Sequence, residues 1–323
     1  MVPEQGAASV PALQDRHARM DDGFELPLRS WLPDAAPRAV LLAVHGLNDY
    51  SRAYDELGRR LAADGIAVYA YDQRGFGGTL KWGYWHGSER LVRDLDAMTQ
   101  LLRRRYPDRP VFVLGESMGG AVVLSALADQ GFTADGVVLV APAVWSRDAM
   151  PFYQRWGLAI MAHTLPGELL TGKAIDIRPT DNIDMLRAWA RDPLVIKATR
   201  VDVLYGLTNL MDRAMAAAPR VHGSVLLLYG AHDELVPKQA LCHFLAAVPV
   251  GDAGLNLTTA FYPDGYHMLT RDLDGQRVQD DIAQWILNRP GFVPASRLTL
   301  CDGGAEIAAT VAGELTTKDT KGY

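Results

Sequence analysis

The sequence predicts an α/β fold with a mostly parallel central sheet and an inserted helical cap. Short apolar runs rich in Val, Leu and Ile alternate with amphipathic stretches of helical length. This alternation is typical of parallel strands joined by right-handed helical crossovers. It stops between residues 143 and 221, where only helical patterns occur, and then resumes. The strand-like runs span 40–44, 66–71, 111–114, 136–140, 225–229 and 255–262.

The other elements follow from local patterns along the chain. Residues 17–20 and 24–31 alternate in polarity around Asp21, Asp22 and Gly23, which predicts a β-hairpin. Apolar residues at helical spacing predict helices in both parts of the core and in the cap. These stretches are 54–63, 91–106, 121–127, 156–163, 185–190, 203–218, 238–248 and 278–287.

These patterns divide the 323 residues into five segments. We expect a flexible leader at 1–16, a first core part at 17–142, the cap at 143–221, a second core part at 222–290 and a loosely ordered tail at 291–323. The leader lacks the apolar stretch of a signal peptide, which favours the cytoplasm for the chain as it stands. A trimmed targeting segment would instead indicate a periplasmic or membrane-anchored protein.

Composition excludes several classes of function. The net charge of -6 and the lack of a basic block argue against nucleic-acid binding. No apolar run reaches the length of a membrane span. The two cysteines, Cys242 and Cys301, are too few for a disulfide framework or a metal cluster, and we expect a buried small side chain and a tail residue. The sequence implies no metal, no organic cofactor and no particular oligomeric state.

The most informative stretch lies at 111–127. Its strand-like run ends at Gly115, Ser117 follows two residues later, and Gly119 precedes a helical pattern. This is G-x-S-x-G between a strand and a helix, the setting of a nucleophile elbow, in which a sharp turn lifts the serine hydroxyl above the sheet. The alternative is a glycine-rich turn with a chance serine. We interpret Ser117 as the nucleophile.

A serine nucleophile needs a base, and the base needs an orienting acid. Asp233 and His267 each follow a predicted strand, in the chain order serine, acid, histidine that this kind of elbow uses. We therefore predict these three residues as a catalytic triad, with Glu234 and Asp264 as alternative acids. For Glu116, inside the elbow, a local hydrogen bond near the turn is the preferred interpretation.

Acyl transfer also needs donors for the developing oxyanion. The backbone N–H of Met118, directly after the nucleophile, is the first predicted donor. The second is the N–H of Leu47, in the loop that follows the run at 40–44. We expect His45, at the start of this loop, to brace it rather than to transfer protons.

With these motifs the chain resembles the serine hydrolases of the monoacylglycerol lipase and bacterial lysophospholipase group, within the α/β-hydrolase superfamily. The resemblance implies an α/β-hydrolase fold and the triad and oxyanion donors named above. Two loops depart from the pattern of the group and affect head-group choice. One is Leu47-Asn48-Asp49-Tyr50, where Gly-Glu-His is common, and the other holds Phe76 in place of a histidine. The matching motifs are His45-Gly46, Asp72 with 74–77, 115–120, 192–194, Asp233 and Tyr266-His267.

The cap is unusually apolar, and a cap above the strand ends roofs the crevice where ligands bind in such sheets. We therefore expect a serine ester hydrolase for a lipid-like ester, such as a monoacylglycerol or lysophospholipid. The apolar cap also allows peripheral membrane contact. Three alternatives stay open: a broad small-ester carboxylesterase, an amide hydrolase whose ammonium site uses Asp176, Asp181 or Asp184, and a non-catalytic binding protein. The apolar cap residues are Met150, Trp156, Leu158, Ile160, Met161, Leu165, Leu169, Leu170, Leu204, Leu207, Leu210 and Met211.

Overall fold

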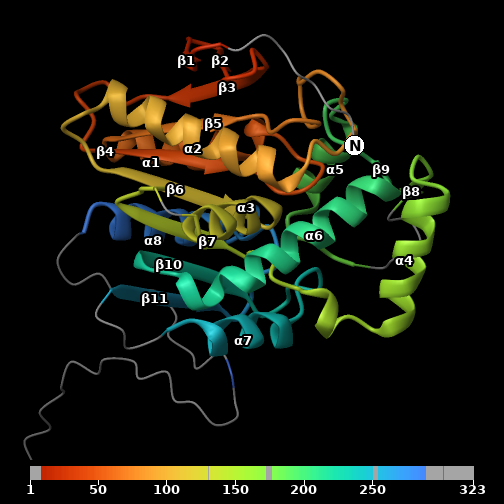
Figure 1. Cartoon of the computed structure of the whole chain (residues 1–323). Helices are drawn as coiled ribbons and strands as arrows, with labels where there is room; N and C mark the ends of the chain where they lie inside the picture. Colours follow the sequence, from red (N-terminus) through yellow and green to blue (C-terminus); the bar gives the residue numbers. More distant parts are fainter. Residues whose placement is uncertain (1–8, 130, 172–176, 250–253, 289–300, 302–323) are drawn as a thin grey trace, which may run out of the picture.

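The computed structural model describes residues 9–129, 131–171, 177–249, 254–288 and 301 (Figure 1). The predicted α/β architecture is confirmed: helices flank a nine-stranded central sheet. In chain order the strands are β1 (Ala12–Leu13), β2 (His17–Arg19), β3 (Glu25–Trp31), β4 (Ala39–Val44), β5 (Ile66–Tyr71), β6 (Val111–Glu116), β7 (Gly136–Val140), β8 (Leu169–Thr171), β9 (Ala198–Arg200), β10 (Gly223–Gly230) and β11 (Leu255–Tyr262). The α-helices are α1 (Asp55–Ala63), α2 (Ser88–Arg105), α3 (Met118–Leu127), α4 (Phe152–Thr164), α5 (Ile183–Arg191), α6 (Val201–Ala217), α7 (Lys238–Ala247) and α8 (Gly275–Ile286).

The strand order in the main sheet is β1-β2-β3-β5-β4-β6-β7-β10-β11. Strands β1, β2, β3 and β5 pair antiparallel, whereas all pairs from β5 to β11 are parallel. Register aligns the carboxyl ends: Val44 lies opposite Gly115, and Glu116 opposite Val140. The loops after β4, β6 and β7 therefore leave the sheet side by side, which is where a doubly wound sheet binds its ligands.

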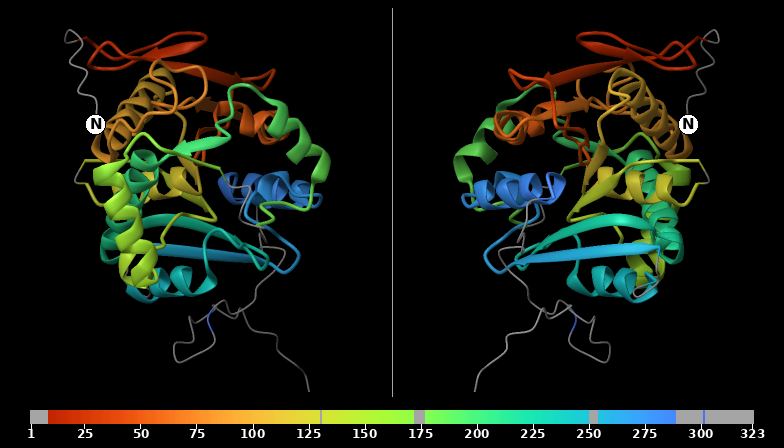
Figure 2. Two further views of the ribbon diagram at one scale, coloured as in Figure 1. Left: turned by 90° about the vertical axis from the view of Figure 1, so that its right-hand side faces the viewer. Right: turned by 90° about the vertical axis from the view of Figure 1, so that its left-hand side faces the viewer.

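Helices cover both faces of the sheet (Figure 2), and an apolar layer fills the space on each face. Strands β4, β5, β6 and β7 are buried along their whole length, which explains their unbroken apolar runs. On one face Leu57 of α1 and Ile282 of α8 join the core. On the other face the core includes Leu95 of α2, Val122 of α3 and Phe244 of α7. The sheet is therefore a rigid platform for the loops at its carboxyl edge.

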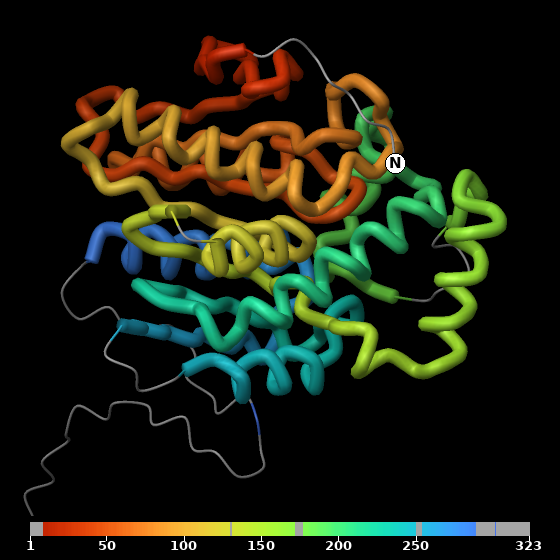
Figure 3. Tube along the Cα trace, viewed as in Figure 1, coloured from red at the N-terminus to blue at the C-terminus, as the bar shows by residue number. Residues whose placement is uncertain are grey.

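The cap lies at that edge and is not purely helical as we expected. Strands β8 and β9 pair antiparallel in a two-stranded sheet, beside α4, α5 and α6 (Figure 1). Three-residue strands carry too little periodicity to be recognised in the sequence. The tube in Figure 3 shows α6 running back across α3, and its Leu210 and Ala214 are buried in the main core. Helix α4 lies farther out, and none of its described residues is buried.

Two further expectations were wrong. Ala12–Leu13, placed in a flexible leader, form β1 and pair with Ala18 and Arg19, so the predicted hairpin extends to three strands. Cys242 of α7 and Cys301 form a disulfide across 59 residues of sequence, whereas we expected two unpaired cysteines. The disulfide ties one point of the expected tail to the α/β core, and the rest of 291–323 lies outside the described residues.

Within the described part of the chain, no helix has both the length and the apolarity of a membrane span. The same residues hold no cluster of three or more His, Cys, Asp or Glu side chains arranged to bind a metal ion.

Candidate active site

Ser117 lies at a sharp turn between β6 and α3. Its backbone has φ 53° and ψ -116°, a conformation that costs a non-glycine residue free energy and is characteristic of functional turns. The turn is held firmly, because Ser117 N donates to Val140 O and Ser117 O accepts from Ala143 N. Met118 begins α3, so its N–H belongs to the first turn, where helix amides have no intrahelical acceptor.

Two glycines make this turn sterically feasible. A Cβ on Gly115 would lie 2.5 Å from Gly119 O, and a Cβ on Gly119 would lie 2.0 Å from Val44 O. Any side chain at either position would therefore force the strand and the helix apart. The glycines of the motif thus bring the start of α3 against the end of β4.

Asp233 and His267, from the loops after β10 and β11, are joined directly. His267 Nδ1 lies 2.8 Å from Asp233 Oδ2, and both side chains are buried. The other carboxylate oxygen, Asp233 Oδ1, accepts from the backbone N–H groups of Leu235 and Val236, both at 2.9 Å. The carboxylate is therefore fixed in orientation, and with Nδ1 as the donor the imidazole leaves Nε2 as its proton acceptor.

The surroundings of His267 shift its protonation. Burial lowers the pKa of the imidazole, but the charge and hydrogen bond of Asp233, with a further contribution from Glu116, outweigh burial and raise the pKa above its ordinary value. Arg271 opposes this rise. Glu116 directly precedes Ser117 and accepts a hydrogen bond from Arg271, four residues after His267, so the elbow and the histidine loop lie close together.

The loop after β4 packs against the nucleophile. A Cβ on Gly46 would lie 3.3 Å from Ser117 Cβ, so a larger residue would press on the serine. The chain then turns tightly, with Asn48 at φ 66°. Leu47, the predicted oxyanion donor, lies in the chain between Gly46 and Asn48. The cap supports the same turn, because Asn48 O accepts from Ile196 N and Asn48 Nδ2 donates to Thr199 Oγ1.

His45 is fully enclosed at the start of this loop. Its Nε2 accepts from Gln73 N at 2.9 Å, so its proton lies on Nδ1, which donates to Gly46 O at 2.8 Å. Burial lowers the pKa of His45 below its ordinary value, and the ring is neutral. The contacts match the bracing role that we expected for this histidine.

Comparison with known proteins identifies the family. The model of the family described as serine aminopeptidase, S33, a hydrolase family, matches residues 35–274. The chain belongs to this family. That span runs from β4 to the short 3-10 helix η5 (Leu269–Arg271) and therefore includes every residue of the candidate active site.

The relatives of this S33 hydrolase include lipases. A monoglyceride lipase from Rattus norvegicus is 28% identical over 299 residues, which cover 89% of this chain and 95% of the relative. A monoacylglycerol lipase from Mycolicibacterium smegmatis is 29% identical over 281 residues, covering 82% and 94%. The crystal structure of Paleococcus ferrophilus monoacylglycerol lipase has a TM-score of 0.68 at 24% identity and covers 81% of this chain and 98% of its own. The predicted α/β-hydrolase fold and the resemblance to the monoacylglycerol lipase group are confirmed.

The alternative site residues of this hydrolase have other contacts than the bond between Asp233 and His267. Glu234 Oε2 accepts from Arg178 N, and Asp264 is exposed, whereas Asp233 holds the histidine. Of the carboxylates considered for an ammonium site, Asp176 lies outside the described residues and Asp181 Oδ1 accepts from Leu273 N. The third, Asp184, is exposed, lies 3.1 Å from Arg187 on α5, and lines a cavity between α5 and the loop after β4.

We expected Glu116 to form a local hydrogen bond near the turn, and this expectation was wrong. Its Oε1 accepts from Arg271 Nη2 at 3.2 Å, across 155 residues of sequence, so the bond is not local to the turn. Sequence reasoning missed Arg271 altogether. Its only signal in the sequence was its place four residues after His267, in the loop that carries the predicted base.

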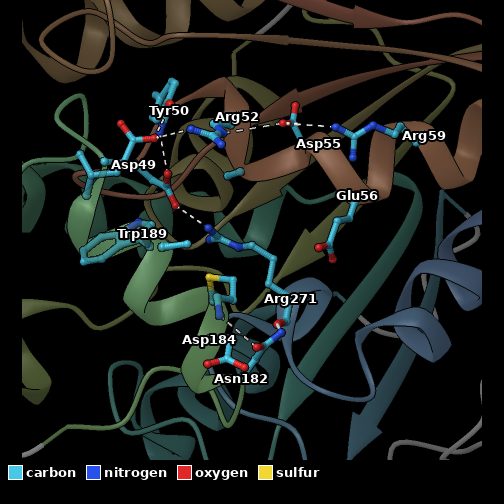
Figure 4. A pocket seen from close by; sticks show the side chains of 15 residues that line it. Asp49, Tyr50, Arg52, Asp55, Glu56, Arg59, Asn182, Asp184, Trp189 and Arg271 are labelled. Atoms are coloured by element: carbon cyan, nitrogen blue, oxygen red, sulfur yellow. Dashed lines mark hydrogen bonds and ion pairs between the residues drawn. The ribbon is translucent and has the colours of Figure 1, made fainter.

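Two cavities of about 510 Å³ each lie along the cap segment that follows α5. The first, called the polar cavity, lies between the loop after β4 and α5 and is lined mostly by charged and polar side chains, with Asp49, Trp189 and Arg271 among its walls (Figure 4). The second is largely apolar and is lined by Trp82, Leu169 and Ile196 among others. Val195 lines both, so the two cavities adjoin.

The cap is fastened to the core beside the polar cavity. Asp192 Oδ2 accepts from Tyr50 Oη at 2.7 Å and from Arg52 Nη1 at 2.9 Å. Asp192 belongs to the segment 192–194, one of the motifs that carry the resemblance. The two bonds fix the end of α5 against the loop that carries the predicted oxyanion donor Leu47.

Proposed function

We propose that this hydrolase cleaves lipid-like esters, of the monoacylglycerol type, through an acyl-enzyme on Ser117. His267 takes the serine proton as Ser117 Oγ attacks the ester carbonyl, and Asp233 holds the imidazole in the required tautomer. The N–H groups of Leu47 and Met118 donate to the oxyanion. His267 then protonates the leaving alcohol, and water releases the fatty acid by the same route in reverse. The observation that carries the proposal is the 2.8 Å bond between His267 and Asp233 in the same loop cluster as the Ser117 turn.

The two adjoining cavities support an amphiphilic substrate. The polar cavity offers charged and hydroxyl groups to a hydroxylated head group such as glycerol. The apolar cavity, with Trp82 and Leu169, suits an acyl chain. Rat and mycobacterial relatives that carry lipase names support the same substrate class.

We expect the specificity constant to rise with acyl length. Each methylene buried in an apolar channel contributes about 0.8 kcal/mol, or roughly fourfold in kcat/KM, until the channel is full. The measurement is kcat/KM for glycerol monoesters with acyl chains of increasing length, each below its micellar concentration. A steady decline beyond butyrate would contradict the proposal and support the small-ester alternative.

A matched pair of variants sharpens this test. Leu169 lines the apolar cavity and is 55% exposed, whereas Leu32, 50% exposed, follows β3 at the opposite edge of the sheet. Leu169→Asp should reduce kcat/KM for long-chain esters far more than for acetates. Leu32→Asp should change neither. Equal effects of Leu169→Asp on kcat/KM for both substrates would show that the apolar cavity does not bind the acyl chain.

The family description names aminopeptidases, so an amide substrate is the second candidate. Aminoacyl amides belong in the same substrate panel. Faster cleavage of these amides than of monoacylglycerols would overturn the lipid proposal while leaving the roles of Ser117, Asp233 and His267 intact.

We also propose that α4 contacts the membrane surface that holds the substrate. Phe152, Trp156 and Ile160 are spaced four residues apart on this helix and are each at least 60% exposed, so they form one apolar stripe. We expect wild-type protein to sediment with phosphatidylcholine vesicles and the Phe152→Ser, Trp156→Ser double variant to sediment much less. The control is Leu32→Ser, which removes an exposed apolar side chain elsewhere. Equal sedimentation of all three proteins would contradict membrane contact through α4.

A further inference from the structure

Arg271 is a buried arginine whose side chain joins three catalytic loops. It ends the short 3-10 helix η5 (Leu269–Arg271), four residues after His267, and is 8% exposed. Its Nη1 donates to Asp49 Oδ2 at 2.7 Å, and its Nη2 donates to Glu116 Oε1 at 3.2 Å. Figure 4 shows the Arg271 side chain pointing toward Asp49 among the residues that line the polar cavity.

Each partner lies next to a residue that the acyl-transfer step uses. Asp49 is two residues beyond Leu47, the proposed oxyanion donor, and Glu116 directly precedes Ser117. One planar guanidinium therefore links the loops after β4, β6 and β11. A guanidinium suits this task because its donors are fixed in one plane and can hold two carboxylates at once.

Stability alone does not account for this cluster. Asp49, Glu116 and Arg271 are all buried, and together they carry two negative charges against one positive. Desolvation of buried ion pairs often cancels their attraction, so such a group adds little to folding. The loop that Asp49 holds is under strain at Asn48, and a turn of this kind needs support to keep its N–H groups in place.

We propose that Arg271 is a positioning residue for acyl transfer, which holds the oxyanion loop through Asp49 against the nucleophile turn through Glu116. The inference rests on the proposed function, since it concerns the same site. Arg271 acts through Leu47 and Ser117 and takes no part in proton transfer. The bond between Arg271 and Asp49 sets how closely the Leu47 N–H approaches the reacting carbonyl.

The test is the kinetics of Arg271→Lys on a p-nitrophenyl ester, which has no glycerol head group to contact the polar cavity. Lysine keeps the charge but cannot hold both carboxylates in one plane. Loss of one oxyanion donor costs about 100- to 1000-fold in kcat, and a misplaced donor somewhat less. We therefore expect kcat to fall by about 10- to 100-fold with KM changed less than about threefold.

Arg74 is a matched control for burial and charge. It is 2% exposed and pairs with Asp94 and Asp22, which lie on α2 and in the β2–β3 turn rather than in the proposed oxyanion loop or elbow. Arg74→Lys should lower the melting temperature at least as much as Arg271→Lys but leave kcat close to the wild-type value. If Arg74→Lys and Arg271→Lys lower the melting temperature equally and also lower kcat equally, the inference is overturned.

A double-mutant cycle with Asp49→Asn separates the bridge from a general loss of folding. Asp49→Asn is nearly isosteric and should itself lower kcat by about tenfold, since it weakens the same link. The double variant Asp49→Asn, Arg271→Lys should lose little more than Arg271→Lys alone. Independent, multiplicative losses, or unchanged kcat in Asp49→Asn, would contradict a shared bridge.

Labelling with a fluorophosphonate distinguishes failure of this inference from failure of the proposed function. Wild-type protein should be labelled at Ser117, and Arg271→Lys should be labelled more slowly in proportion to its kcat. If wild-type is labelled and Arg271→Lys matches it in rate and kcat, the positioning role is wrong and the proposed function stands. If Ser117 of the wild-type protein is not labelled, the proposed function fails, and this inference fails with it.

Discussion

Ser117→Ala should reduce kcat for ester hydrolysis by about six orders of magnitude, as the loss of a triad nucleophile does in other serine hydrolases. The loss is this large because the variant can form no acyl-enzyme. The variant should fold normally, since alanine removes one oxygen and keeps the Cβ that packs against Gly46. The measurement is the rate of monoacylglycerol hydrolysis at saturating substrate, with the melting temperature as a check on folding.

Gly46 offers a control for the space around the nucleophile. Gly46→Ala keeps the serine but places a methyl group 3.3 Å from its Cβ, so we expect partial loss of activity rather than abolition.

Substantial hydrolysis by Ser117→Ala would show that the chemistry uses another residue.

Asp233→Asn should reduce kcat by about four orders of magnitude. An asparagine in the place of Oδ2 can present its N–H₂ group to His267, which favours the tautomer with the proton on Nε2 and blocks its use as a base. The two backbone N–H groups of Leu235 and Val236 would orient the amide oxygen at the Oδ1 position, leaving the amino group toward the histidine. The outcome that would contradict this role is a variant with near wild-type kcat.

The pH dependence provides a second measure of the same pair. The reaction needs neutral His267, so the rate should fall as pH drops through the pKa of this histidine. Burial lowers that pKa, but Asp233 and Glu116 raise it by more than burial lowers it. The acid limb of the pH–rate profile should therefore lie above the ordinary histidine value of about 6.5. Glu116→Gln removes a carboxylate that raises the pKa and should move the limb to lower pH. A limb well below 6.5 in the wild-type protein would contradict the geometry of the pair.

Much of this fold was predictable because its signals are local. Strands β4 to β7 are buried on both faces and therefore appear as unbroken apolar runs. The elbow could be recognised in the sequence because close packing permits only glycine at positions 115 and 119, two residues before and two residues after Ser117. Asp233 and His267 could be assigned because each follows a strand, and parallel strands end at one edge.

The features that were missed depend on distant parts of the chain. Nothing near Arg271 indicates that it meets Asp49, 222 residues away, because three loops first come together in the folded sheet. Cys242 and Cys301 pair across 59 residues, and two cysteines give no spacing pattern. Strands β1 and β8 have two and three residues, too few to show alternation.

The central claim is that Ser117 carries the acyl group during cleavage of lipid-like esters. The most direct test is peptide mass spectrometry of wild-type protein after reaction with a long-chain alkyl fluorophosphonate, which mimics the acyl-transfer transition state. We predict one equivalent of the alkylphosphonyl group on the peptide that contains Ser117, and protection from labelling by excess monoacylglycerol. An adduct on a different residue, or no adduct while the enzyme still hydrolyses esters, would contradict the account.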